Sequence, residues 1–101
     1  MALTGQVLDP AGRPIAGAVV HLRRQQRDFP GGAVTGDELV TFESGSVLVA
    51  DAAGRFRTPP ELDPDGDYAA YTSAPGYLTS RTLWTKGASG AFPVIRLRPV
   101  P

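Results

Sequence analysis

The sequence contains no cysteine and only one histidine, His21. The lack of cysteine excludes disulfides, thiolate metal sites and cysteine nucleophiles, while it leaves the redox compartment open. A Ser-His-Asp triad would have to use His21, and strand alternation predicts an exposed, solvent-facing position for this side chain. We therefore expect no catalytic residues, no cofactor and no enzymatic activity.

No sign of charge predominates, because ten Lys and Arg residues balance ten Asp and Glu residues. Nothing global draws such a chain to a polyanion, so we expect no nucleic-acid partner. No apolar stretch approaches the length of a membrane span, so we expect no membrane insertion. The first residues also lack the basic and apolar regions of a signal peptide. Two locations stay open: the cytoplasm if Met1 is the native start, and a secreted or cell-envelope location if the chain comes from a longer one.

Helical periodicity is missing as well, since no window keeps an i, i+3, i+4, i+7 apolar pattern and 12 Gly and 10 Pro interrupt every candidate helix. Short alternating runs between turn residues repeat instead, which is the pattern of an all-β sandwich or barrel. We expect residues 1–101 to form one domain. The seven expected strands span residues 3–8, 18–23, 47–50, 55–58, 68–73, 78–85 and 94–98.

Alternation along these strands assigns side chains to an inner and an outer face. In the strand at 78–85 either Leu83 or Trp84 points outward, and with Leu83 in the core Trp84 lies on the outer face. Four segments with Asp or Pro before a Gly, at 9–12, 51–54, 63–66 and 74–76, predict turns in which the Gly takes a positive φ. The expected core comprises Leu3, Val7, Ala18, Val20, Leu22, Phe56, Tyr68, Leu83, Ile95 and Leu97.

Several of these residues also form motifs, which read GxVxDxxGxPIxGAxVxL from Gly5, ADAAGRF from Ala50, GDY from Gly66 and APGY from Ala74. With them the chain resembles the carboxypeptidase regulatory-like domain family. The resemblance implies a prealbumin-like Greek-key β-sandwich of Ig-like architecture, usually an accessory domain, and implies a fold more than a function. Hydroxyisourate hydrolases and intradiol dioxygenases share this type of sandwich. Both need more than one histidine, so the single His21 fits neither set.

The segment at about 24–46 is longer than the corresponding link in that family. One interpretation is a solvated loop with an added hairpin, in which Leu39, Val40 and Phe42 supply a short extra strand. The other is a loop that docks a protein partner or a neighbouring domain, because its basic residues precede Phe29 and its acidic residues follow. The candidate interaction residues are Arg24, Arg27, Phe29, Asp37, Glu38, Phe42 and Trp84.

The alternative function is that of a ligand-binding module. An exposed Trp84 would offer a flat platform to a carbohydrate, although cover of its ring by the long loop is the other interpretation. Asp63, Asp65 and Asp67 are candidate calcium ligands, because alternate carboxylates around a Gly suit a hard cation. An EF-hand loop that starts at Asp63 would need Gly at position 68 and Glu at position 74, which are Tyr and Ala. A polar turn is therefore the competing interpretation.

Overall fold

The computed structural model describes residues 2–27, 34–42, 45–63, 66–84 and 92–101, and within these ranges all regular structure is β-strand. This confirms the expected all-β fold. None of the described residues belongs to a helix that could cross a membrane. The strands are β1 Thr4–Leu8, β2 Val19–Arg27, β3 Val34–Leu39, β4 Val47–Val49, β5 Arg55–Arg57, β6 Tyr68–Ser73, β7 Ser80–Trp84 and β8 Ile95–Arg96.

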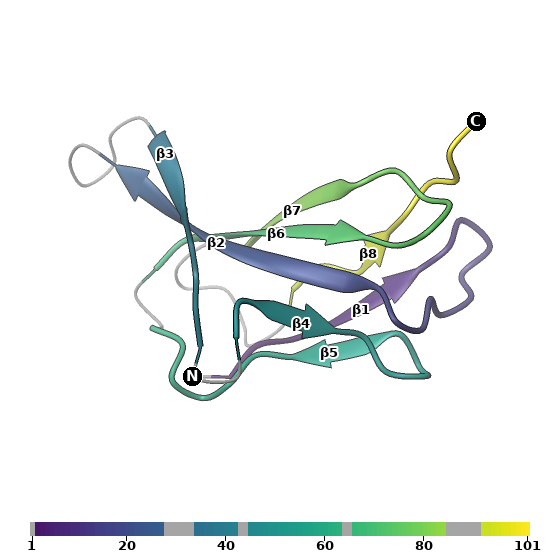
Figure 1. Cartoon of the computed structure of the whole chain (residues 1–101), viewed down its shortest axis with the longest axis horizontal. Coiled ribbons are helices and arrows are strands. Elements are labelled where there is room, and N and C mark those ends of the chain that lie inside the picture. The colour runs from purple at the N-terminus through teal and green to yellow at the C-terminus, as the bar shows by residue number, and fades with distance from the viewer. Residues whose placement is uncertain (1, 28–33, 43–44, 64–65, 85–91) are drawn as a thin grey trace.

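The strands form two sheets. In the smaller sheet β1 lies between β5, to which it is antiparallel, and β8, to which it is parallel. The larger sheet has the order β3-β2-β6-β7, and β4 also pairs with β2. Residues 19–24 of β2 pair with β6, and the other edge of β2 pairs with β4 at residues 19–21 and with β3 at residues 23–27. Figure 1 shows β2 as the longest strand, reaching past the others at one end of the molecule.

The count of seven strands was too low, because β3 adds an eighth within the described residues. β2 does not end near Arg23 but continues to Arg27, and β3 turns back along it as an antiparallel hairpin. The interpretation of the 24–46 segment as an added hairpin is therefore confirmed. The extra strand ends at Leu39, so Val40 and Phe42, which we expected inside it, follow it instead.

One cluster of buried side chains joins the two sheets. The expected inner faces are confirmed with one exception: Leu83 is 45% exposed, whereas Trp84 is 2% exposed. Trp84 is the cross-strand partner of Tyr68, a core residue, and Leu83 is the partner of Ala69. The β6–β7 register thus decides which side chains of β7 face the core, because a shift of the pairing by one residue would turn every side chain to the other face. The smaller sheet and its flanks contribute Leu3, Val7, Phe56, Ile95 and Leu97, and the larger sheet contributes Val20, Leu22, Leu48, Tyr68, Ala70 and Trp84.

The turn at residues 51–54 connects β4 of the larger sheet to β5 of the smaller one. The Asp51 carboxylate accepts hydrogen bonds from the backbone N–H groups of Ala53 and Arg55, each at 2.9 Å. Gly54 completes the turn with a φ of 71°. The expected turn is confirmed here, because the aspartate satisfies the backbone and the glycine adopts the left-handed conformation.

Gly66 departs from this rule, because it is absent from the glycines with positive φ. A Cβ at this position would lie 2.8 Å from the Tyr68 hydroxyl and 3.1 Å from Arg24 Nε. Position 66 therefore favours glycine for reasons of space, since the Tyr68 ring and the Arg24 side chain occupy the volume that a side chain at position 66 would need.

Candidate functional site

The hairpin formed by β2 and β3 contains most of the predicted interaction segment. Its outer part extends beyond β6, because the β6 register stops at Arg24 whereas β3 remains paired as far as Arg27. Figure 1 shows the two strand ends projecting from the sandwich. The register also shifts between Gln26 and Arg27, which marks a β-bulge. Such an irregularity increases local twist and is common at sheet edges.

Arg24 and Asp63 come together, although we assigned them to different candidate sites. Arg24 Nη1 lies 2.9 Å from Asp63 Oδ2, and both side chains are roughly half exposed. The Asp63 carbonyl accepts a 2.7 Å hydrogen bond from the Tyr68 hydroxyl. Burial raises the pKa of Tyr68 above its ordinary value, and the nearby Arg24 charge opposes this rise. The base of the hairpin is thereby attached to the 63–66 turn.

Two predicted interaction residues, Phe42 and Trp84, are core residues, so their assignment to an exposed contact surface is wrong. Phe42 is 7% exposed and Trp84 is 2% exposed. Trp84 packs against Tyr68 with ring centroids 6.1 Å apart. Phe42 is held by two 2.9 Å backbone hydrogen bonds with Gly45, which direct the chain back toward β4. Large aromatic side chains contribute more to folding inside the sandwich than on its surface.

The remaining predicted residues divide into two groups. Glu38 is exposed and is the cross-strand partner of Arg24 in the hairpin. Arg27 and Asp37 occupy β2 and β3, but their side chains lie outside the described part of the structure, as does Phe29 altogether. Of the calcium candidates, Asp65 falls outside the described residues. Among those described, no three acidic or histidine side chains form a metal-binding group.

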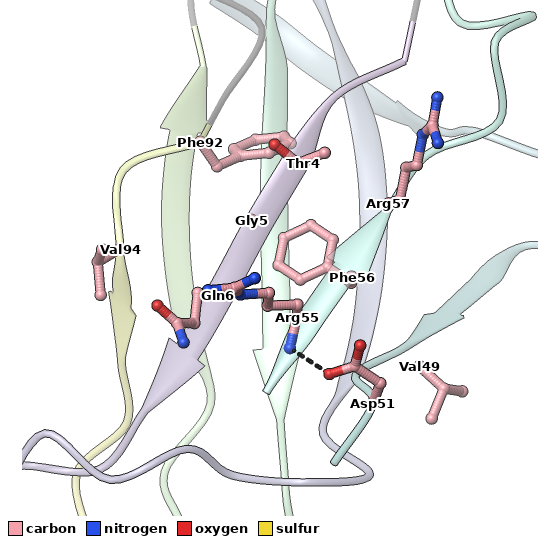
Figure 2. A pocket seen from close by; sticks show the side chains of 10 residues that line it. All are labelled: Thr4, Gly5, Gln6, Val49, Asp51, Arg55, Phe56, Arg57, Phe92 and Val94. Carbon is pink, nitrogen blue, oxygen red and sulfur yellow. Dashed lines mark hydrogen bonds between the residues drawn. The ribbon is translucent and has the colours of Figure 1, made fainter. Parts of the chain in front are cut away.

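Sequence reasoning missed a hollow of about 560 Å³ on the smaller sheet. In Figure 2 the Phe56 ring and the backbone of Gly5 lie near its centre, with Val49 on one side and Val94 on the other. Both valines are more than half exposed. In the sequence, the only sign that these valines are exposed was their position next to buried residues in an alternating strand. The other lining residues are Thr4, Gln6, Asp51, Arg55, Arg57 and Phe92.

Two polar side chains of this hollow are used by the adjacent 51–54 turn. Asp51, the one carboxylate in its lining, is engaged by the backbone of the 51–54 turn. Gln6 Nε2 donates a 3.1 Å hydrogen bond to the Ala53 carbonyl, so this side chain is also used by the turn. No histidine, and no serine or cysteine nucleophile, is among the lining residues.

A second hollow, of about 360 Å³, lies on the larger sheet around His21. The predicted exposure of His21 is only partly correct, because the side chain is half-buried. Besides His21, the hollow is lined by Arg23, Leu39 and Tyr71. A catalytic imidazole needs an acid to orient it and a nucleophile to activate, and neither is among these neighbours.

Solved structures with the same fold include both structural and enzymatic proteins. The C-terminal domain of the shaft pilin SpaA from Lactobacillus rhamnosus GG matches with a TM-score of 0.65 and 17% identity, covering 98% of this chain and 97% of that one. Catechol 1,2-dioxygenase from Pseudomonas arvilla C-1 matches with a TM-score of 0.55 and 19% identity, covering 99% and 52%. 3-Chlorocatechol 1,2-dioxygenase from Rhodococcus opacus 1CP gives 0.56 and 14%, covering 98% and 59%.

At these identities the likeness concerns the fold alone. The chain spans somewhat more than half the length of the two dioxygenase chains, so a large part of each enzyme has no counterpart in this chain. No curated protein sequence matches the chain. The model of the carboxypeptidase regulatory-like domain matches residues 2–91, so the chain belongs to this family.

Proposed function

We propose that residues 1–101 act as one non-catalytic accessory domain that docks a protein partner or a neighbouring domain through the β2–β3 hairpin. The observation that carries this proposal is the position of the hairpin. Gln25 still donates a backbone hydrogen bond to the Asp67 carbonyl, just before β6, whereas Gln26 and Arg27 lie past the β6 register and pair with β3.

The exposed edge of the hairpin suggests how a partner would bind. β3 stands at the end of the strand order among the described residues, so its outer edge presents backbone N–H and C=O groups. A partner strand can pair with such an edge, and backbone hydrogen bonds then supply affinity while side chains supply specificity. Proteins commonly cover or blunt exposed edges to avoid unwanted pairing, which makes an extended edge strand a candidate contact.

Two comparisons support a module without a catalytic centre. The pilin match covers nearly the whole of both chains, whereas both dioxygenase matches leave more than a third of the enzyme chain uncovered. Among the described residues, the lining of the hollow around His21 also includes no acid. The carbohydrate alternative loses its platform, because Trp84 packs in the core rather than on the surface.

The test is to shorten the hairpin without disturbing its base. Gln25 and Asp37 are cross-strand partners, so replacing residues 26–36 with Asn-Gly joins them through a two-residue hairpin turn. Partners are captured from the native source with the intact domain, identified by mass spectrometry and titrated in purified form. We expect the shortened domain to remain folded and to bind the purified partner at least about tenfold more weakly.

The matched control is Leu78→Ala, which alters an exposed side chain outside the hairpin. It should leave the dissociation constant unchanged. A shortened domain that stays folded and binds every purified partner as the intact one does would show that the hairpin is passive, and the proposal would then fail.

A further inference from the structure

The outer face of the larger sheet combines positive charge with exposed aliphatic side chains. The strand registers define four rows of neighbouring positions on this side of β2, and three of them hold no acidic residue. From β7 across to β3 or β4, these three rows are Leu83–Ala69–Arg23–Leu39, Arg81–Tyr71–His21–Val47 and Ser73–Val19–Val49. The fourth row, at the hairpin end of the face, pairs Gln25 with Asp37. The chain as a whole is neutral, so the positive charge of the three rows reflects segregation rather than composition.

Tyr71 organises the positive charge at the centre of this outer face. Arg81 Nε donates a 3.0 Å hydrogen bond to the Tyr71 hydroxyl. The guanidinium carbons of Arg23 and Arg81 lie 6.0 and 5.9 Å from the centre of the Tyr71 ring. Contacts of this kind hold a long side chain in place, so less conformational entropy is lost when the guanidinium binds a ligand. Two arginines are thus positioned on one aromatic ring.

Aliphatic side chains border these cations on both sides. Of the seven large hydrophobic residues that are exposed in the described part of the chain, four lie on the outer face. Ala69, in the middle of the first row, is completely buried although it does not belong to the core cluster. Its cross-strand neighbours are Arg23 and Leu83, so these two positions flank a covered site on this face. The four exposed residues are Leu39, Val47, Val49 and Leu83.

We propose that this outer face docks an acidic segment of a partner protein. Carboxylates of the segment bind Arg23 and Arg81 beside Tyr71, and its aliphatic side chains pack on Leu39 and Leu83. The proposal rests on the proposed function as a protein-docking domain, and it names a second contact surface together with the chemistry of the partner.

Charge complementarity and the aliphatic border together identify this occupant. Guanidinium groups bind carboxylates with well-defined geometry, which gives the contact its specificity. A nucleic-acid backbone or a lipid headgroup would satisfy the cations but would leave the aliphatic side chains without apolar partners. An extended peptide that carries acidic and aliphatic residues two positions apart presents both to the same surface and so satisfies both.

The closing experiment uses a defined probe, the acetylated and amidated six-residue peptide Glu-Ser-Val-Ser-Glu-Ser, in which Glu and Val share one face of an extended chain. It is titrated into the isotope-labelled full chain while the backbone amide signals are followed by NMR. We expect shifts concentrated in β2, β6 and β7 and weaker binding at high salt, because exposed charges are screened. The same peptide with Lys in place of Glu should not bind. If the acidic peptide leaves these amide signals unchanged, or shifts mainly the smaller sheet, the proposal is wrong.

Two matched pairs of substitutions separate specific recognition from general attraction. Arg23→Gln with Arg81→Gln should weaken binding of the acidic peptide by about tenfold or more. Arg55→Gln with Arg57→Gln removes the same charge from exposed positions on β5 and should leave binding almost unchanged. Arg23→Lys with Arg81→Lys keeps the charge and should retain part of the affinity. Equal losses in the two Gln pairs would indicate nonspecific attraction and overturn the proposal.

Two further measurements identify the class of partner. Tighter binding to a twelve-nucleotide single-stranded DNA or to phosphatidylserine vesicles than to the acidic peptide would overturn the proposal in favour of a polyanion surface. The purified partner from the hairpin experiment is then titrated into the Arg23→Gln, Arg81→Gln variant. If this variant binds normally while the shortened hairpin does not, the outer face is not the contact and the proposed function still stands. If neither change weakens binding, both proposals fail.

Discussion

Gly5 and Phe56 are cross-strand partners, and the Phe56 ring occupies the space that a side chain at position 5 would need. The ring is 4% exposed and packs against Phe92 with centroids 5.9 Å apart. Because two rings and a strand backbone meet at this point, Phe56 has little freedom to move aside. The glycine of the opening motif and the phenylalanine of the ADAAGRF motif therefore form one packing unit between β1 and β5.

Gly5→Ala should destabilise the domain by about 1–3 kcal/mol, because its methyl group overlaps the Phe56 ring and forces the core to rearrange. Urea unfolding followed by circular dichroism measures the change. Thr4→Ala, on the neighbouring exposed position, serves as the control and should change stability by no more than about 0.5 kcal/mol. Equal effects of the two substitutions would show that the Phe56 ring does not occupy this space.

Trp84→Ala should destabilise the domain by about 3–5 kcal/mol, because it removes a buried aromatic side chain and leaves a cavity beside Tyr68. Leu83→Ala alters the adjacent exposed residue and should cost no more than about 0.5 kcal/mol. Thermal or urea unfolding of both variants tests the face assigned to β7. A larger effect at Leu83 than at Trp84 would mean that the strand presents its other face to the core.

The stability of the domain should fall as the pH rises above about 10. Burial holds the pKa of Tyr68 above its ordinary value of 10.0, so the unfolded chain loses this proton at a lower pH than the folded chain does. The folded state then binds more protons than the unfolded state, and by linkage its stability decreases with increasing pH. Below the unfolded value the tyrosine is neutral in both states and the full stability is present.

Tyr68→Phe isolates this contribution. The substitution removes the hydroxyl that donates to the Asp63 carbonyl, which should cost about 1 kcal/mol at neutral pH. It should also reduce the alkaline loss of stability, because phenylalanine does not titrate. Urea unfolding at pH 7, 9 and 11 makes the comparison. An identical alkaline slope in the two proteins would assign the loss to other groups.

Millimolar calcium should leave the melting temperature unchanged. A ligand that binds only the folded state must raise it, but the Asp63 carboxylate is already paired with Arg24, so calcium would have to compete with an arginine. Differential scanning calorimetry with and without calcium, with magnesium as the control, tests this expectation. An increase in the calcium sample that disappears in the Asp63→Ala, Asp65→Ala double variant would establish a metal site.

The sequence by itself determined the all-β class, the position of most strands and most of the core. These properties are local: alternation assigns Val20 and Leu22 to one face, and an aspartate followed by glycine encodes the 51–54 turn whatever surrounds it. The family motifs are local in the same way. The glycines at positions 5 and 66 were visible too, but the reason for them was not, because it depends on how the Phe56 ring from β5 and the Tyr68 and Arg24 side chains fold back over them.

Tertiary structure alone decided which side chains gather on each surface. Whether Leu83 or Trp84 faces outward depends on the register with β6, and alternation permits both choices equally. The outer face brings His21 and Arg23 of β2 and Arg81 of β7 together around Tyr71 of β6, and the Arg24–Asp63 pair joins residues 39 positions apart in the chain. Contacts of this kind follow from the pairing of distant strands, because each side chain meets its partners only after the sheets have formed.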